Sequence, residues 1–147
     1  MSKQEEAALI LKLYELRREE TMRKARDWFF RDFNPQSFLE FDNAMFSANG
    51  GYVRMVVSYW DMAAALVNGG AIPRDLFNDS NAEHFFVFSK IELLLGEVRA
   101  SMAPQFAVQL EKLIDATPEG RNRVAAIRGR AKTVQAKLAH QPAQAAS

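Results

Sequence analysis

The sequence predicts an all-α protein: a single-domain helical bundle of about five to six helices, with long N-terminal and C-terminal helices. Two observations lead to this prediction. Helix-capping residues and prolines recur between apolar stretches. In addition, no stretch alternates apolar and polar residues between turn signals, as a half-buried sheet requires. With 147 residues, 48% of them hydrophobic, the chain can enclose one core.

The first predicted helix begins at a capping box formed by Ser2 and Glu5, in which each side chain accepts a hydrogen bond from the other residue's backbone N–H. It runs to about Arg31, because neither proline nor glycine interrupts it. The pair Asn34-Pro35 then supplies an N-cap followed by proline, which predicts a shorter second helix that ends before a double glycine.

The third predicted helix spans about residues 52–68, and Gly69 fits the left-handed position that follows a helix. Its circumference is apolar except for one polar stripe, so we expect a central helix packed by neighbours on several sides. Trp60 is predicted to lie in the core, with its indole N–H hydrogen-bonded. The stripe consists of Arg54, Ser58, Asp61 and Asn68.

The second half of the chain predicts three more helices. Residues 73–79 form a turn or a single helical turn, and Ser80 with Glu83 fits a second capping box. The helix that follows runs to about residue 100 and includes the strand-like segment FFVFS. Pro104 opens the fifth helix, and Thr117-Pro118 opens the sixth.

We expect one helical domain over residues 1–140 and a disordered tail over residues 141–147. The longest uncharged stretch, residues 62–73, is about half the roughly 20 residues that a membrane-spanning helix needs. The N-terminus does not have the pattern of a signal peptide. These features predict no membrane span and a cytoplasmic location, which suits a chain without cysteine.

Asp61 is the residue whose role the sequence leaves most open, because it can face water, a cationic partner or a ligand. If it is buried, it needs a cation, since an unpaired buried charge costs several kcal/mol. Arg18 interrupts an apolar stripe of the first helix, and Arg99 lies two turns from Glu92 in the fourth, so Arg18–Asp61 and Arg99–Asp61 pairs are hypotheses. The candidate polar cluster is Asp61, Arg18, Arg54, Trp60, Glu92 and Arg99.

The last predicted helix combines an apolar seam with a basic surface. Residues 1–119 carry 13 Lys/Arg and all 18 Asp/Glu, a net charge of −5, whereas residues 120–147 carry six Lys/Arg and no acid. The basic helix either packs on the chain's own acidic body or meets a partner. The seam, with heptad spacing, is Val124, Ile127, Ala131, Val134 and Leu138. The basic residues are Arg121, Arg123, Arg128, Arg130, Lys132 and Lys137.

The sequence carries no recognisable catalytic or metal-binding motif. It has no cysteine and only two histidines, and no glutamate has a histidine three residues on, as di-iron bundles require. The HExxH, P-loop, EF-hand and G-x-S-x-G patterns are missing. We therefore predict no catalytic residue, no metal and no cofactor, and an enzymatic role is not favoured.

The stretch from Phe38 to Phe106 resembles a family of uncharacterised bacterial helical proteins. In that family a helix with an aromatic-aromatic-acid signature ends in glycine and precedes a short acidic, apolar turn. The matching residues are Tyr59-Trp60-Asp61, Ala64, Leu66, Gly69-Gly70-Ala71-Ile72 and Asp75-Leu76-Phe77. The resemblance implies a bacterial protein of helical fold and supplies no catalytic residue.

Three functions follow from these features. The first is a protein–protein interaction module, with self-association through the first and last helices, because both are long and carry apolar seams. The second is binding of an anionic partner, nucleic acid or a lipid surface, through the basic last helix. Nucleic acid is less favoured, because that helix has no aromatic residue on which bases stack. The third is a small-molecule site around Asp61.

Overall fold

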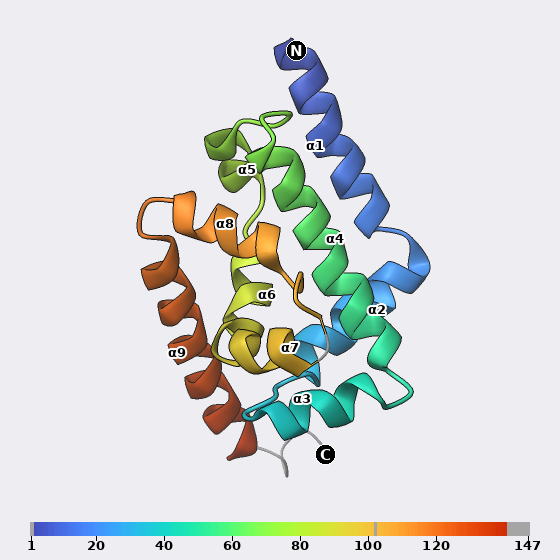
Figure 1. The fold of residues 1–147 in the computed structure, drawn as a ribbon, viewed down its shortest axis with the longest axis vertical. Helices are drawn as coiled ribbons and strands as arrows, with labels where there is room; N and C mark the ends of the chain where they lie inside the picture. The colour runs from blue at the N-terminus through green and yellow to red at the C-terminus, as the bar shows by residue number, and fades with distance from the viewer. Residues whose placement is uncertain (1, 102, 141–147) are drawn as a thin grey trace.

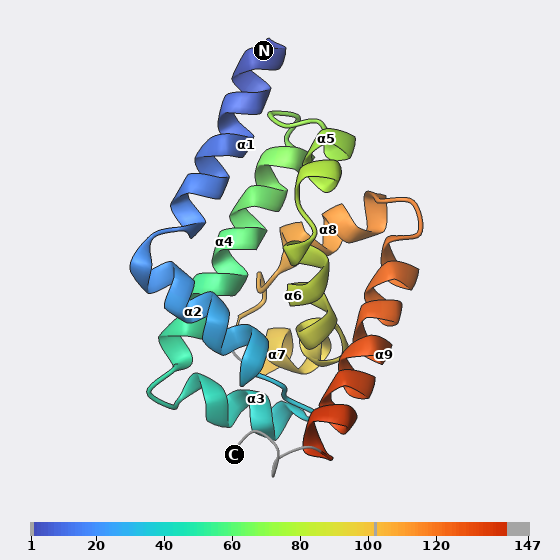
Figure 2. The same ribbon diagram turned by 180° about the vertical axis from the view of Figure 1, so that it is seen from behind.

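The computed structural model describes residues 2–101 and 103–140, and within them the chain is all helical, as predicted. The central helix α4 (Gly50–Asn68) lies between α2 (Glu20–Arg31) and α8 (Val108–Ala116) (Figure 1). On the opposite side of the molecule, α6 (Glu83–Ile91) packs against α9 (Gly120–Ala139) (Figure 2). The remaining elements are α1 (Lys3–Arg17), α3 (Phe38–Met45), α5 (Arg74–Ser80), the 3₁₀ turn η1 (Glu92–Leu94) and α7 (Leu95–Ser101).

Helix α4 is the core helix that its composition predicts. Trp60 is 1% exposed, and its ring lies at the centre of an aromatic cluster that includes Phe77 and His84. The helix ends in a Schellman motif, in which Ala71 N–H donates to Leu66 O at 2.9 Å. The left-handed residue of this motif is Gly70, with φ +88°, and not Gly69 as the sequence suggested.

The first predicted helix is two helices, α1 and α2, because the chain turns at Arg18 and Glu19. The capping box at Ser2 is present as predicted. The Glu19 carboxylate accepts hydrogen bonds from the N–H groups of Thr21 and Met22 and so starts a new helix. A glutamate at this position is not a common N-cap, and for that reason the break was not predicted.

The second half of the chain differs from the prediction in two helix starts and one interruption. Ser80 ends α5 and does not cap α6, because its hydroxyl donates to Leu76 O within α5, and the Glu83 carboxylate bonds to Arg26. The predicted helix from residue 83 to 100 is interrupted by η1, which separates α6 from α7. Pro104 lies in a turn, and α8 begins only after Ala107, which has φ +54°.

Two other helices, α3 and α9, also begin at residues other than those predicted. Ser37, and not Asn34, caps α3 through a hydrogen bond from Glu40 N–H. Helix α9 begins after the left-handed Glu119, because the hydroxyl of Thr117 donates to Leu113 O within the preceding helix. The predicted tail, residues 141–147, lies outside the described residues. In the part of the chain that is described, no helix is long and apolar enough to cross a bilayer.

Substitution by alanine is expected to have opposite effects on stability at two glycines of α9. A Cβ on Gly120 would lie 2.1 Å from Ile114 O, so Gly120→Ala forces the backbone apart where α9 begins. A Cβ on Gly129, in the helix interior, meets nothing within 4 Å. We expect Gly120→Ala to lower the free energy of unfolding by about 1–3 kcal/mol and Gly129→Ala to raise it by ~1 kcal/mol. Urea denaturation of both variants measures this difference, and equal effects would contradict the close approach at Gly120.

Candidate functional site

Trp60 is held by a partly buried carboxylate that comes from α6. Its indole N–H donates to Glu83 Oε2 at 2.9 Å. The same carboxylate accepts two hydrogen bonds from the Arg26 guanidinium, at 2.9 and 2.7 Å, and the two side chains are 23% and 17% exposed. The hydrogen bonds that Arg26 donates to Glu83 raise the pKa of Arg26 above its ordinary value. The indole therefore has the hydrogen-bond partner that was expected, but Glu83 and Arg26 were not predicted for this role, because the capping-box pattern places Glu83 in a helix cap.

Asp61 contacts the N-terminus of α8 and forms no ion pair with an arginine of the described residues. Its Oδ1 accepts a hydrogen bond of 2.9 Å from Leu110 N–H, the third residue of that helix. The first N–H groups of a helix have no partner within the helix, and its positive end attracts a carboxylate. Two turns along the polar stripe, Asn68 donates to Gln109 O at 2.9 Å. Asp61 and Asn68 thus join α4 to α8, whereas Arg54 and Ser58 of the same stripe are exposed.

The other members of the predicted polar cluster lie apart from Asp61. Arg18 is exposed and lies over the Tyr14 ring, and Arg54 is exposed near the start of α4. Arg99 donates to Phe106 O and to Glu111. The Arg18–Asp61 and Arg99–Asp61 pairs are therefore both wrong. Among the described residues, none of the five other members of the predicted cluster forms an ion pair with Asp61.

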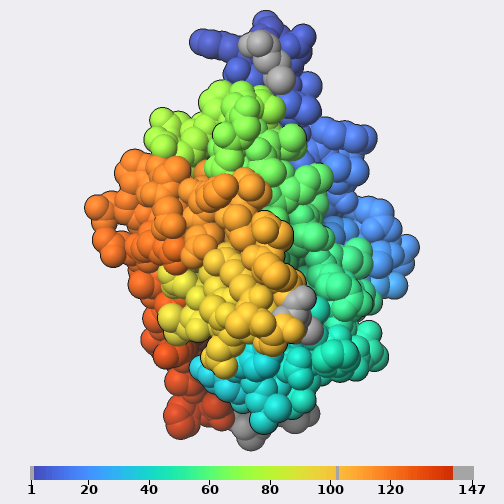
Figure 3. Space-filling model, in the orientation of Figure 1, coloured from blue at the N-terminus to red at the C-terminus, as the bar shows by residue number. Residues whose placement is uncertain are grey.

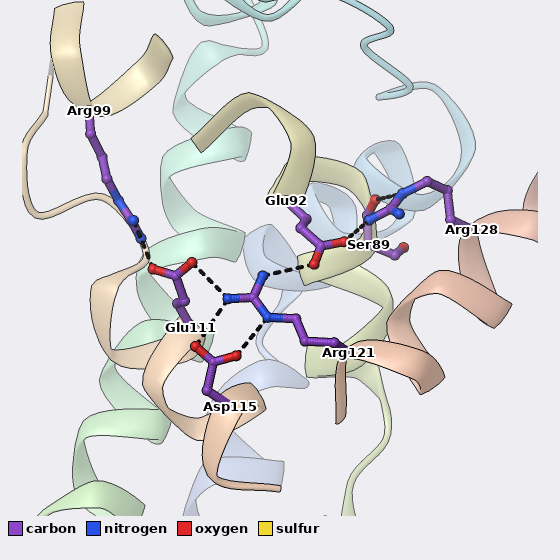
Figure 4. A network of polar contacts seen from close by, with 7 residues as sticks. All are labelled: Ser89, Glu92, Arg99, Glu111, Asp115, Arg121 and Arg128. Atoms are coloured by element: carbon purple, nitrogen blue, oxygen red, sulfur yellow. Dashed lines mark hydrogen bonds and ion pairs between the residues drawn. The ribbon is translucent and has the colours of Figure 1, made fainter. Parts of the chain in front are cut away.

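The N-terminal half of α9 docks on the acidic body through a network of ion pairs (Figure 4). Arg121 donates to Glu92 at 2.8 Å, to Glu111 at 2.9 Å and to Asp115 at 2.6 Å. Arg128 bonds to Ser89 O and to the other oxygen of Glu92. Burial raises the pKa of Glu111, but hydrogen bonds from Arg99 and Arg121 outweigh it and lower the pKa overall. Two of the six basic residues are thus neutralised within the fold.

The four other basic residues of α9 form no salt bridge with the described part of the chain. Arg123 lies over the Phe85 ring, 4.0 Å from its centroid. Arg130, Lys132 and Lys137 are exposed. The positive charge of α9 is therefore partly used for docking and partly available at the surface.

The apolar seam of α9 leaves the body as it proceeds toward the C-terminus. Val124 is fully buried and Ile127 is half-buried, whereas Val134 is 54% and Leu138 is 66% exposed. A groove of about 580 Å³ runs beneath the exposed part, between α9 and the ends of α2 and α6. Its apolar lining consists of Phe30, Phe86, Ile127, Val134 and Leu138. A cavity of about 510 Å³ that reaches Arg123 shares Phe30, Phe86 and Ile127, and the two together are called the α9 groove.

Lys90 closes the floor of the α9 groove. Its ammonium group donates to Phe29 O, Phe30 O and Phe33 O at 2.6–2.9 Å, the carbonyl groups at the C-terminal end of α2. Burial lowers the pKa of Lys90 to about 8, and Asp32 opposes this shift. Its ammonium group also lies 5.4 Å from the centroid of the Phe86 ring, which packs edge to face against Phe30 with centroids 5.0 Å apart. The groove therefore has an aromatic floor.

The comparisons with known proteins place the chain in a family. Residues 4–117 match the model of the family described as "Domain of unknown function (DUF4760)". The chain belongs to this family. No curated protein and no solved structure matches it. The matched residues end before α9 begins, so that α9 and its side of the groove lie outside the matched part of the chain.

His84 is a polar residue that is buried in the core. His84 is fully buried among the rings of Trp60, Phe77 and Phe85, and its Nε2 lies 2.9 Å from Asn78 Oδ1. Burial lowers the pKa of His84 to about 3, and the charges of Arg123 and Arg17 add to the effect. Among the described residues, no group of three or more His, Asp and Glu side chains is placed to hold a metal ion. His84 is therefore a neutral core residue.

Substitution of Asp61 distinguishes a helix cap from an ion pair. Asp61→Asn keeps an oxygen that accepts from Leu110 N–H, whereas Asp61→Ala leaves this N–H without a partner. We expect Asp61→Ala to lower the free energy of unfolding by about 1–2 kcal/mol and Asp61→Asn to cost less than half of that. Loss of an ion pair would instead make Asp61→Asn cost about 3–5 kcal/mol. Chemical denaturation of both variants measures the ratio.

The burial of His84 predicts how stability depends on pH. Between pH 6.5 and about 3, the unfolded chain binds a proton at this residue that the folded chain does not. The free energy of unfolding therefore falls as the pH falls through this window, by up to about 1.4 kcal/mol per pH unit. Denaturation between pH 7 and 5, where carboxylates contribute little, measures this slope. His84→Gln should flatten it, and an unchanged slope would assign the titration to another group.

Proposed function

We propose that the protein is an interaction module of the bacterial cytoplasm that binds a helical segment of a partner protein in the α9 groove. One observation carries the proposal: the heptad seam of α9 continues past the point where the body stops covering it. A seam with this spacing packs against another helix. From Ile127 to Leu138 it extends for about 16 Å at 1.5 Å per residue, so a partner helix of three to four turns matches its length.

The charges around the groove favour an acidic partner. Arg123 and Arg130 line it and form no salt bridge with the described residues, and Lys90 adds a positive charge at the floor. Two acids line it: Glu83 is paired with Arg26, which leaves Asp32. An amphipathic helix with an apolar stripe and flanking glutamates or aspartates complements this surface.

Two other functions have less support from the geometry. Binding of nucleic acid or an anionic lipid surface through α9 is weakened as a proposal, because Arg121 and Arg128 already neutralise carboxylates of the same chain. A small-molecule site around Asp61 is weakened because this carboxylate caps α8. Neither Asp61 nor Trp60 lines the α9 groove. Because the groove contains neither of these two residues of the predicted small-molecule site, we propose a binding role and not a catalytic one.

A designed peptide tests the groove directly. The probe is a fluorescent helical peptide of about four turns, with leucines at the heptad core positions and glutamates beside them. Fluorescence anisotropy measures its affinity. We expect the double variant Val134→Glu/Leu138→Glu to weaken binding tenfold or more, since the substitutions remove apolar contact and place negative charge against an acidic helix. Both residues are exposed, so the variant should fold like the wild type.

Leu39→Glu provides the matched control, because Leu39 on α3 is 66% exposed, as is Leu138. It should leave the affinity unchanged. A peptide with lysines in place of the glutamates should bind less tightly than the acidic one. If the lysine peptide binds equally well, or if Leu39→Glu has the effect of the double variant, the proposal is overturned. Salt-sensitive binding of nucleic acid or phosphatidylserine vesicles that is unchanged in the Val134→Glu/Leu138→Glu variant would favour the anionic-partner alternative.

A further inference from the structure

Helix α1 carries an apolar stripe that the described chain covers only in part, through Arg17 and Arg18 over the Tyr14 ring. Leu11 is 66% and Tyr14 is 47% exposed, and Ala7 on the same stripe is also exposed. In the sequence this stripe continues into Met22 and Phe29 of α2, which are buried. The turn at Arg18 and Glu19 directs the two halves of the stripe to different surroundings. The half on α2 enters the core and the half on α1 faces outward.

The outward orientation is fixed and is not the result of a loosely attached helix. Ile10 and Leu13 anchor the opposite side of α1 in the core. Tyr59 on α4 donates its hydroxyl to Leu13 O, and Arg26 on α2 donates to Arg17 O at 3.1 Å. The N-terminal turns of α1 project beyond the rest of the bundle (Figure 3). The apolar stripe is therefore presented on a rigid helix that a second molecule can approach.

We propose that a second copy of this chain covers the stripe, through an antiparallel pair of α1 helices related by a two-fold axis at Leu11. The exposed positions follow the 3-4-3-4 spacing of a helix-pairing seam: Gln4, Ala7, Leu11, Tyr14 and Arg18. An antiparallel pair centred on Leu11 sets the small Ala7 of one copy near the large Tyr14 of the other, and the two Leu11 side chains meet at the axis.

The charges of α1 favour the antiparallel arrangement. Glu5 and Glu6 lie in its first turn, and the exposed Arg18 follows its last residue, whereas Arg17 lies over the Trp60 ring of the same chain. Antiparallel pairing brings the acidic end of each helix near the basic end of the other, whereas parallel pairing brings like charges together. Helix dipoles also favour the antiparallel pair. Two helices of 15 residues bury less than the roughly 1,600 Å² of a standard interface, so we expect a dimer that dissociates on dilution.

Sedimentation velocity over a range of concentrations tests the dimer. The wild-type chain should shift with concentration from the 16.6 kDa monomer toward twice that mass. Leu11→Lys sets two ammonium groups against each other at the axis and should leave a monomer at every concentration. Leu39→Lys, at a site of the same 66% exposure, should dimerise like the wild type. A wild-type chain that is monomeric throughout, or a Leu11→Lys chain that still dimerises, overturns the proposal.

The absence of cysteine allows the geometry to be tested by oxidation of single-cysteine variants. Leu11→Cys should form a disulfide-linked dimer many times faster than Leu39→Cys. A mixture of Ala7→Cys and Tyr14→Cys should form the mixed dimer in preference to either homodimer, because in an antiparallel pair two Tyr14 positions lie about 9 Å apart along the axis. Rapid Tyr14→Cys homodimers would instead show a parallel pair. Since Leu11→Lys leaves the α9 groove intact, peptide binding there distinguishes failure of this proposal from failure of the proposed function.

Discussion

The Glu83 carboxylate joins the helices of the interior to one another. It accepts hydrogen bonds from Trp60 on α4 and from Arg26 on α2, while its own backbone begins α6. Arg26 also links this group to α1, because it donates a hydrogen bond to Arg17 O. One partly buried acid and its arginine therefore link four helices. A charged group that is largely removed from water is costly unless its partners are in place, and for this reason it favours one arrangement of the helices over looser packings of the same apolar surfaces.

Helix α9 divides into two halves that have different physical roles. The first half is held by Val124 in the core and by the carboxylates that surround Arg121. The 3₁₀ turn η1 matters here, because Glu92 at its start accepts from both Arg121 and Arg128. Partly exposed ion pairs of this kind contribute little stability one by one, but a network fixes the direction of a helix. The second half of α9 therefore extends past the body of the protein, and the α9 groove lies beneath it.

The fold class, the family resemblance and the central position of α4 were predictable from the sequence. They depend on local or periodic signals: apolar residues around most of a helix, capping boxes, and glycines followed by proline. The capping box at Ser2 and the helical state of FFVFS are in the structure as predicted. The helix breaks at Glu19 and η1 were not predictable, because no proline or glycine marks either one.

For the candidate sites, the sequence by itself identified some of the residues, such as Trp60, Asp61 and Arg121, but neither their partners nor the residues of α2 and α6 that line the groove. It determined that Trp60 is a core residue, that Asp61 lies on a polar stripe, and that the last helix pairs an apolar seam with basic residues. The tertiary structure decided that Asp61 caps α8, that Glu83 holds Trp60, and that the seam is covered only in part. The physical reason is that a periodic pattern shows which side of a helix is apolar, whereas the partner of a polar group depends on which helix lies opposite. That choice is made by long-range packing, which a single sequence does not encode in any local signal.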